Sequence, residues 1–96
     1  MKRQNTTSLG DALSLWVDTM NMRQQINEKR LIASWGAIVG DYMSSKTRDI
    51  YIKNRTLFVH IDSSVVRNEL VLAKHMLLQR LNSENGGEVI DNIVIM

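Results

Sequence analysis

The sequence predicts a small α+β fold in which a mixed sheet of three strands packs against helices mainly on one of its faces. Two observations support this class. Apolar residues recur at helical spacing through residues 8–40 and again through residues 64–81. Between these segments, residues 50–61 alternate apolar and polar side chains with a period of two, as half-buried strands do. A final segment rich in Ile and Val completes the predicted order α-α-β-β-α-β.

Two helices are predicted in the first 40 residues. Ser8 is the expected cap of the first helix, whose apolar stripe is broken at Asn21. Asn27 is the expected cap of the second helix, and Gly40 is its expected end because glycine is favoured just after a helix. The two stripes comprise Leu9, Leu13, Trp16, Val17 and Met20, followed by Leu31, Ile32, Trp35, Ile38 and Val39.

A β-hairpin is predicted for residues 50–61, with Asn54 and Arg55 in its turn. Alternate side chains of a strand lie on opposite faces of a sheet, so the aliphatic residues of the hairpin are expected to face the helices. The opposite face then presents rings and cations to solvent. The inward set is Ile50, Ile52, Leu57, Val59 and Ile61, and the outward set is Tyr51, Lys53, Phe58 and His60.

One more helix and one more strand are expected after the hairpin. Ser63 and Ser64 offer caps for a helix whose apolar stripe runs from Val66 to Leu81. Gly86 and the glycine after it end that helix, and residues 88–96 are expected to form the last strand.

Length and composition favour one domain. The chain has 96 residues, of which 44% are hydrophobic, which suits a single modest core. We expect residues 1–7 to be a flexible N-terminal tail and residues 8–96 to form the domain. No segment approaches the roughly 18 apolar residues of a membrane span, so a cytoplasmic protein without membrane contact is expected.

Catalysis is the function class that the sequence supports least. There is no cysteine, and His60 and His75 are the only histidines, which leaves no metal-ligating pattern and no nucleophile with a partner base. No glycine-rich phosphate-binding motif is present. The prediction is therefore a non-enzymatic protein with no catalytic residues, no cofactor and no metal.

The charge pattern points to binding instead. Residues 46–55 carry four cations against Asp49, whereas residues 82–96 carry three carboxylates and no base. Rings that stack on bases, flanked by Lys and Arg that neutralise phosphates, are how sheet surfaces hold single strands. The same mixture also suits a protein interface or a homodimer. The candidate phosphate contacts are Lys46, Arg48, Lys53, Arg55 and Arg67, and the candidate stacking or partner contacts are Tyr51 and Phe58.

An ordered set of short motifs resembles the DciA family, also described as domain of unknown function 721. The resemblance covers roughly residues 9–96. The motifs are Trp35-Gly36-Ala37-Ile38-Val39-Gly40, Thr47, Leu57-Phe58-Val59-His60-Ile61, Ser63-Ser64, Glu69-Leu70, Leu81-Asn82, and the closing Val89, Ile93 and Ile95.

The resemblance implies a KH-like fold and a role in bacterial DNA replication. Members of the family assist loading of the replicative helicase onto single-stranded DNA, bind both, and have no ATPase of their own. This chain lacks the Gly-x-x-Gly loop of true KH domains, so weak DNA binding is expected. The alternative is a protein-interaction or homodimerisation module without nucleic-acid binding.

Overall fold

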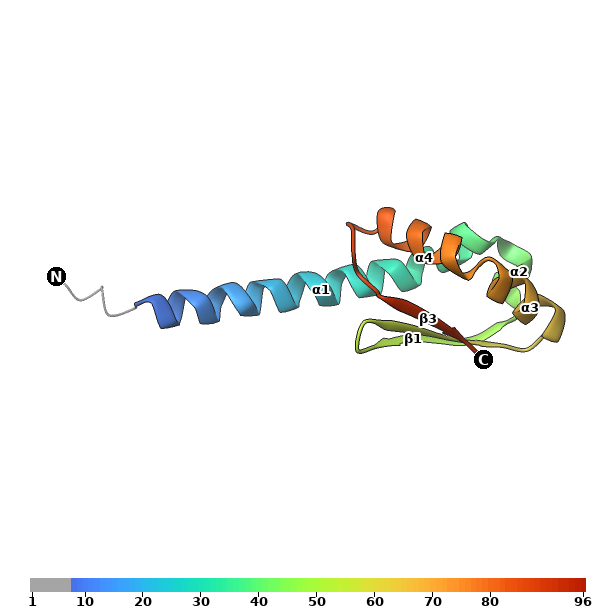
Figure 1. The fold of residues 1–96 in the computed structure, drawn as a ribbon, viewed down its shortest axis with the longest axis horizontal. Coiled ribbons are helices and arrows are strands. Elements are labelled where there is room, and N and C mark those ends of the chain that lie inside the picture. Colours follow the sequence, from blue (N-terminus) through green and yellow to red (C-terminus); the bar gives the residue numbers. More distant parts are fainter. Residues whose placement is uncertain (1–7) are drawn as a thin grey trace.

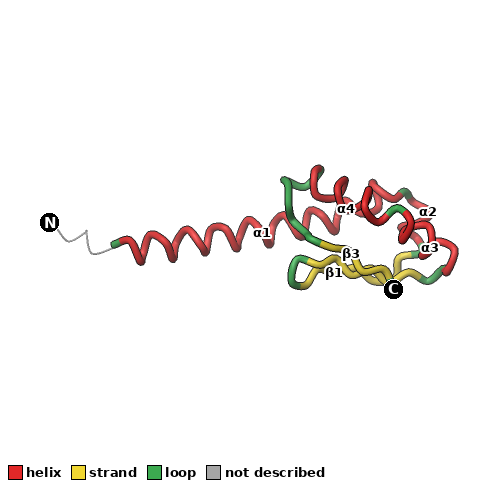
Figure 2. The backbone as a smooth tube through the Cα atoms, viewed as in Figure 1, coloured by secondary structure: helices red, strands yellow, loops and turns green. Residues whose placement is uncertain are grey.

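A computed structural model describes residues 8–96, which form four helices and one sheet of three strands (Figures 1 and 2). The sheet order is β1-β2-β3, with β1 antiparallel and β3 parallel to the central strand β2. The predicted α+β class and mixed sheet are therefore confirmed. The elements are α1 (Leu9–Val39), α2 (Asp41–Ser45), β1 (Thr47–Lys53), β2 (Thr56–Ile61), α3 (Ser64–Leu72), α4 (Lys74–Ser83) and β3 (Asn92–Ile95).

The helices lie on one side of the sheet, as the sequence predicts (Figure 1). Leu57, Val59 and Ile61 of β2 are buried beneath them, and the register places Ile52 opposite Leu57 and Ile50 opposite Val59. The aliphatic face of the hairpin thus forms the floor of the core. The remaining buried apolar residues are Leu31, Trp35, Val66, Leu70, Leu77, Leu81, Val89, Ile90 and Ile93.

The prediction of two N-terminal helices is wrong, because α1 runs without a break for 31 residues. Asn21 and Asn27 lie inside it. No glycine or proline interrupts residues 20–30, and a polar residue alone does not end a helix. Gln24 also bonds Glu28 one turn on, at 2.8 Å between Nε2 and Oε2, which supports the helix where the apolar stripe turns polar.

The helix predicted over residues 64–81 exists but bends. Ala73 leaves helical geometry, with φ −93° and ψ 7°, and separates α3 from α4. The bend allows Leu70 of α3 and Leu77 and Leu81 of α4 to enter one core. Alanine carries no helix-breaking signal, so tertiary packing decides this bend.

The hairpin turn is tight and uses two residues with positive φ, Asn54 at 51° and Arg55 at 58°. Two-residue turns of this kind match the twist of the flanking strands. Asparagine tolerates this region, whereas arginine adopts it at a cost. Arg55 therefore stands in a conformation that its side-chain contacts must stabilise.

Trp35 joins α1 to the start of the sheet. Its ring is 3% exposed, and its Nε1–H donates to Thr47 Oγ1 at 3.0 Å. Thr47 Oγ1 in turn donates to the carbonyl of Met43 at 3.0 Å. One hydroxyl thus satisfies the buried indole and ties α2 to β1.

We expect Thr47→Val to lower the free energy of unfolding by about 1–3 kcal/mol, because the Trp35 N–H would stay buried without an acceptor. Urea unfolding followed by tryptophan fluorescence measures this change. Thr56→Val is the matched control, since the Thr56 hydroxyl makes only an exposed 3.4 Å bond to Asn54 O. Equal stability of the two variants would contradict the role of Thr47.

Candidate nucleic-acid interface

The outer face of the sheet carries a pair of stacked rings. Tyr51 and Phe58 lie opposite each other in the β1–β2 register. Their ring centroids are 5.1 Å apart with planes inclined by 15°. Tyr51 is 39% exposed, whereas Phe58 is half-buried. The helices occupy the other side of the sheet, so solvent reaches the outward side of this pair (Figure 2).

The neighbours of the rings are polar at the edges and apolar at the centre. Lys53 lies opposite Thr56 at the hairpin end, and Asp49 lies opposite His60 at the other end. Val94 of β3 is in register with Phe58 and extends the apolar centre. This face can therefore offer a flat apolar surface to a base or to a partner side chain.

Three of the predicted cations are placed at the two ends of β1. Lys53 is exposed beside the hairpin turn. Lys46 and Arg48 lie at the start of the strand, where a register shift falls between Thr47 and Asp49. Seven residues of strand separate the ends by roughly 20 Å. The cations thus flank the ring pair rather than surround it.

Lys46 and Arg48 already have exposed partners. Lys46 Nζ lies 5.7 Å from the centre of the Tyr42 ring, and Arg48 Nε lies 3.4 Å from Asp62 Oδ1. More than half of each side chain of the Arg48–Asp62 pair is exposed. Contacts of this kind are weak in water, so both cations can exchange their partners for a phosphate.

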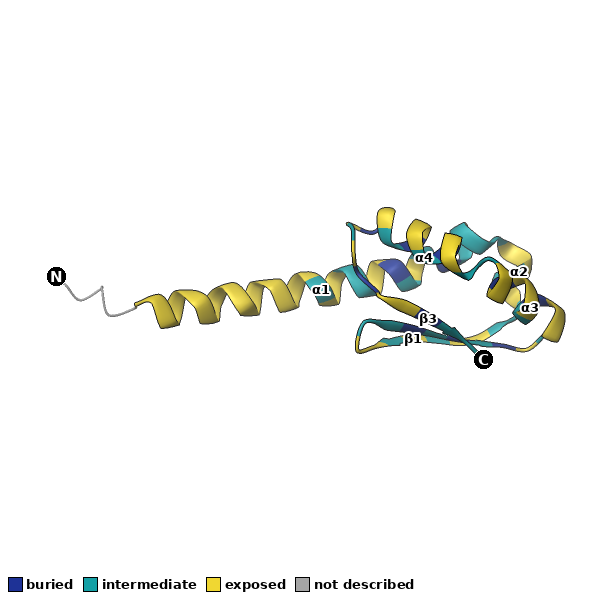
Figure 3. Cartoon of the chain, in the orientation of Figure 1, coloured by how far each residue is buried: buried dark blue, intermediate teal, exposed yellow. Residues whose placement is uncertain are grey.

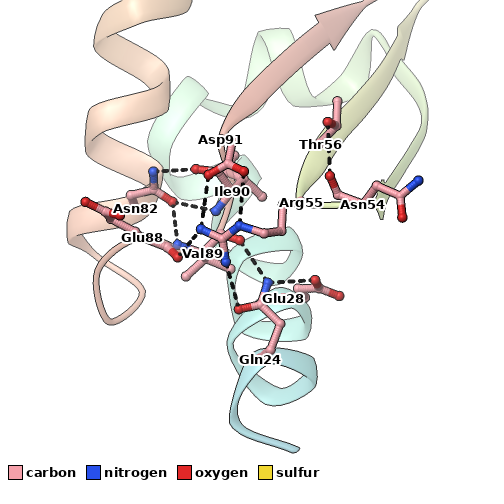
Figure 4. A network of polar contacts seen from close by, with 10 residues as sticks. All are labelled: Gln24, Glu28, Asn54, Arg55, Thr56, Asn82, Glu88, Val89, Ile90 and Asp91. Carbon is pink, nitrogen blue, oxygen red and sulfur yellow. Dashed lines mark hydrogen bonds and ion pairs between the residues drawn. The ribbon is translucent and has the colours of Figure 1, made fainter. Parts of the chain in front are cut away.

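Arg55, a predicted phosphate contact, makes several hydrogen bonds within the fold (Figure 4). Its Nε and Nη2 donate to the two oxygens of Asp91, each at 3.1 Å. Nη2 also donates to the carbonyl of Glu88 at 2.8 Å, and Nη1 to Gln24 Oε1 at 3.4 Å. Arg55 therefore clamps the hairpin turn to α1 and to the segment that leads into β3. Its donors are engaged within the fold.

The clamp changes the ionisation of the acid that it holds. The hydrogen bonds from Arg55 lower the pKa of the Asp91 carboxyl below its ordinary value, and the charge of the guanidinium adds to this effect. The same hydrogen bonds raise the pKa of the Arg55 guanidinium above its ordinary value. The acidic C-terminal segment is thus partly neutralised by the basic hairpin.

Arg67 is also turned toward the fold. Its Nη2 donates to the carbonyl of Ile61 at 2.9 Å, at the end of β2. Its Nε is buried without a hydrogen-bond partner. The structure thus groups Tyr51, Phe58 and Lys53 on one surface, leaves Lys46 and Arg48 at its far end, and engages Arg55 and Arg67 in internal contacts.

Asn82 is a structural residue that sequence reasoning did not assign to the fold. Its Oδ1 accepts from the backbone N–H groups of Val89 and Ile90, both at 3.0 Å, and its Nδ2 donates to Ile90 O at 2.9 Å. It fixes the loop between α4 and β3. The sequence marks it by its place in the Leu81-Asn82 motif and at the start of the polar segment that ends the helix, but neither feature reveals these bonds.

Residues 8–96 contain neither a metal-binding cluster nor a helix that could cross a membrane. No three of His, Cys, Asp and Glu gather at a distance suited to a metal ion within residues 8–96. Over the same residues, no helix joins the length and the apolar character that crossing a bilayer requires.

Residues 8–95 match the model of a family described as Dna[CI] antecedent, DciA. The chain belongs to the DciA family. The resemblance found in the sequence is therefore confirmed. Several residues that carry the DciA resemblance prove to be structural: Trp35 and Leu70 are buried, and Ser63 accepts the Val66 N–H at 3.3 Å as the cap of α3.

Val66, in the first turn of α3, is also fully buried and belongs to the core. No curated protein and no solved structure matches the chain. The KH-like comparison therefore stays a prediction.

The Arg55–Asp91 clamp predicts a pH-dependent contribution to stability. A lowered carboxyl pKa stabilises the fold at pH values above the unfolded value of about 4, and this contribution disappears as the pH falls through the lower folded value. We expect Asp91→Asn to be less stable than wild type at pH 7, and the difference to narrow as the pH falls below about 4.

Urea unfolding of both proteins at several pH values measures this difference. Asp18→Asn is the control, because Asp18 lies on the exposed half of α1. A difference between wild type and Asp91→Asn that stays constant down to pH 2 would show that the clamp does not depend on the charge of Asp91.

Proposed function

We propose that this chain is a non-enzymatic accessory protein of DNA replication that binds the replicative helicase and holds single-stranded DNA on the outer face of its sheet. Membership in the DciA family supports the role in helicase loading. The observation that carries the DNA contact is the stack of the exposed Tyr51 on the half-buried Phe58, with cations at both ends of β1.

In this proposal, a base stacks on the outward side of the Tyr51–Phe58 pair. Stacking of one base on an aromatic side chain contributes about 1–3 kcal/mol and tolerates every base. Lys53 neutralises a phosphate on one side of the rings, and Lys46 and Arg48 neutralise phosphates on the other. Arg55 and Arg67 contribute by shaping the fold, since their guanidinium groups are held by Asp91 and Ile61.

The small number of cations implies weak binding. Single-stranded DNA loses affinity with salt with a slope of about −0.7 per phosphate contact. Three cations therefore imply a slope of about −2 when log affinity is plotted against log salt. Such a weak contact suits a factor that hands DNA to a helicase rather than retaining it.

We expect Tyr51→Ala to weaken binding of fluorescent single-stranded DNA by roughly 5- to 150-fold, the loss of one stacked base. Fluorescence anisotropy across a salt series measures both affinity and slope. Lys53→Gln should reduce the slope by about 0.7.

Two controls isolate these effects. Tyr51→Phe keeps the ring and should bind as wild type does. Lys29→Gln removes an exposed cation of α1 and should leave the slope unchanged. Absence of binding at low salt, or wild-type affinity in Tyr51→Ala, would remove the sheet face as the DNA site.

The helicase contact is tested separately. We expect the full chain to bind purified replicative helicase in isothermal titration calorimetry without DNA, and Tyr51→Ala to bind it equally well. If the helicase binds only wild type, the ring pair is a protein interface. If no variant binds, the alternative of a module unconnected to the helicase gains support.

A further inference from the structure

The first half of α1 extends beyond the rest of the fold (Figures 1 and 3). Every residue from Leu9 to Arg23 is exposed, and Gln24 is the first half-buried residue of the helix. We call the sheet and the helices packed on it the body. Gln24 marks its edge, since the Gln24 Nε2 donates to Val89 O at 2.9 Å. The exposed part is about 22 Å long, at 1.5 Å per residue.

Five large apolar side chains form one stripe along this exposed half. At 100° per residue they fall within about 100° of the helix circumference, although each is between 45% and 74% exposed. Leu31 and Trp35, which are buried against the body, lie on the same side of the helix. The stripe therefore continues the buried face of α1 past the edge of the body. Its residues are Leu9, Leu13, Trp16, Val17 and Met20.

The free end of α1 has one stabilising feature, Asp11 in its first turn, but no side-chain cap. Ser8 makes no capping hydrogen bond with its side chain, and Gly10 costs about 1 kcal/mol relative to alanine within a helix. Helices of about 15 residues are marginal in water without tertiary packing. Burial of the stripe against a partner would supply that packing.

We propose that this stripe pairs with the same stripe of a second copy, with the two helices antiparallel. Leu9, Leu13, Trp16 and Met20 are spaced by four, three and four residues. This spacing reads the same in both directions. A two-fold axis between Ser14 and Leu15 therefore brings Leu9 against the partner's Met20 and Leu13 against the partner's Trp16, and the reverse, in one register.

The length of the exposed half fits this register. The paired segments run from Leu9 to Met20 in both copies and end before Gln24, where the body begins. Leu9 of each helix then lies opposite the partner's Met20, before the other body begins. Spacing by four and three residues is common to amphipathic helices, so the end of the paired segments before Gln24 is what favours a second copy.

The charges of the exposed half are compatible with pairing. Ala12 and Thr19, which flank the stripe within the paired segment, carry no charge. Asp11 and Asp18 lie on the opposite side of the helix. No like charges therefore meet in the contact between the two copies.

The contact between the two helices is small, so its affinity is expected to be low. Two helices that overlap for about 18 Å, each about 10 Å wide, cover much less than the roughly 800 Å² per partner of a standard interface. The pair is therefore a weak dimer that forms with rising protein concentration.

Analytical ultracentrifugation of the full chain over a hundredfold range of concentration tests the proposal. The mass should rise from 11.0 kDa toward twice that value, and the helical circular dichroism signal per residue should rise with it. Leu13→Glu combined with Trp16→Glu should keep the chain monomeric at every concentration.

The matched control changes the opposite side of the same helix. Leu15 and Met22 are 68% and 62% exposed, so Leu15→Glu combined with Met22→Glu adds the same charge and should still dimerise. A wild-type chain that stays monomeric throughout, or a control that dissociates as fully as the stripe variant, would overturn the pairing. If the wild-type chain is monomeric and the stripe variant no longer binds the helicase, the stripe is a contact surface for the helicase instead.

Disulfide trapping tests the register. The chain has no cysteine, so a mixture of Leu9→Cys and Met20→Cys proteins reports only the introduced thiols. Antiparallel pairing predicts disulfides between the two variants, whereas parallel pairing predicts them within each variant and would contradict the register. These measurements need no DNA, so failure of the DNA proposal would leave their outcome unaffected.

Discussion

Alternation of side chains along β2 is the constraint on which the rest of the structure depends. Leu57, Val59 and Ile61 are buried beneath the helices, and Phe58 and His60 between them therefore face outward. Since β2 is the central strand, its register also orients β1 and β3. A shift of one residue would bury Phe58 and expose the aliphatics. The core and the candidate DNA surface are thus two consequences of one pattern.

Charge along the sequence is a poor guide to charge at the surface of this protein. Arg55 belongs to the most basic segment, and Asp91 to the most acidic one. The fold brings them together in a clamp that also holds the Glu88 carbonyl and Gln24. That clamp accounts for an arginine at positive φ in the hairpin turn. The positive electrostatic potential that a phosphate would meet then comes from Lys53 at one end of β1 and from Lys46 and Arg48 at the other.

The residues that identify the family and those proposed to bind are largely different. Trp35, Thr47, Ser63 and Leu70 are buried or bonded within the fold, and Asn82 holds the loop before β3. They specify the arrangement of helices on the sheet. Tyr51 and Lys53, by contrast, are exposed on the opposite face. The stripe on α1 is separate from both, since it shares no residue with the buried set or with the residues proposed to bind DNA.

The sequence by itself determined the α+β class, the hairpin at residues 50–61, the orientation of Tyr51 and Phe58, and the cap at Ser63. Each of these follows from side-chain period or from capping within a few residues, so no distant contact is needed. The continuity of α1 through Asn21 and Asn27 was also within reach of the sequence, since no glycine or proline interrupts residues 20–30. Only the tertiary structure decided that the later helix bends at Ala73 and that Arg55 is bonded within the fold. Those outcomes depend on Leu77 and Asp91, which reach their partners only after the chain has folded, and no local pattern reports such contacts.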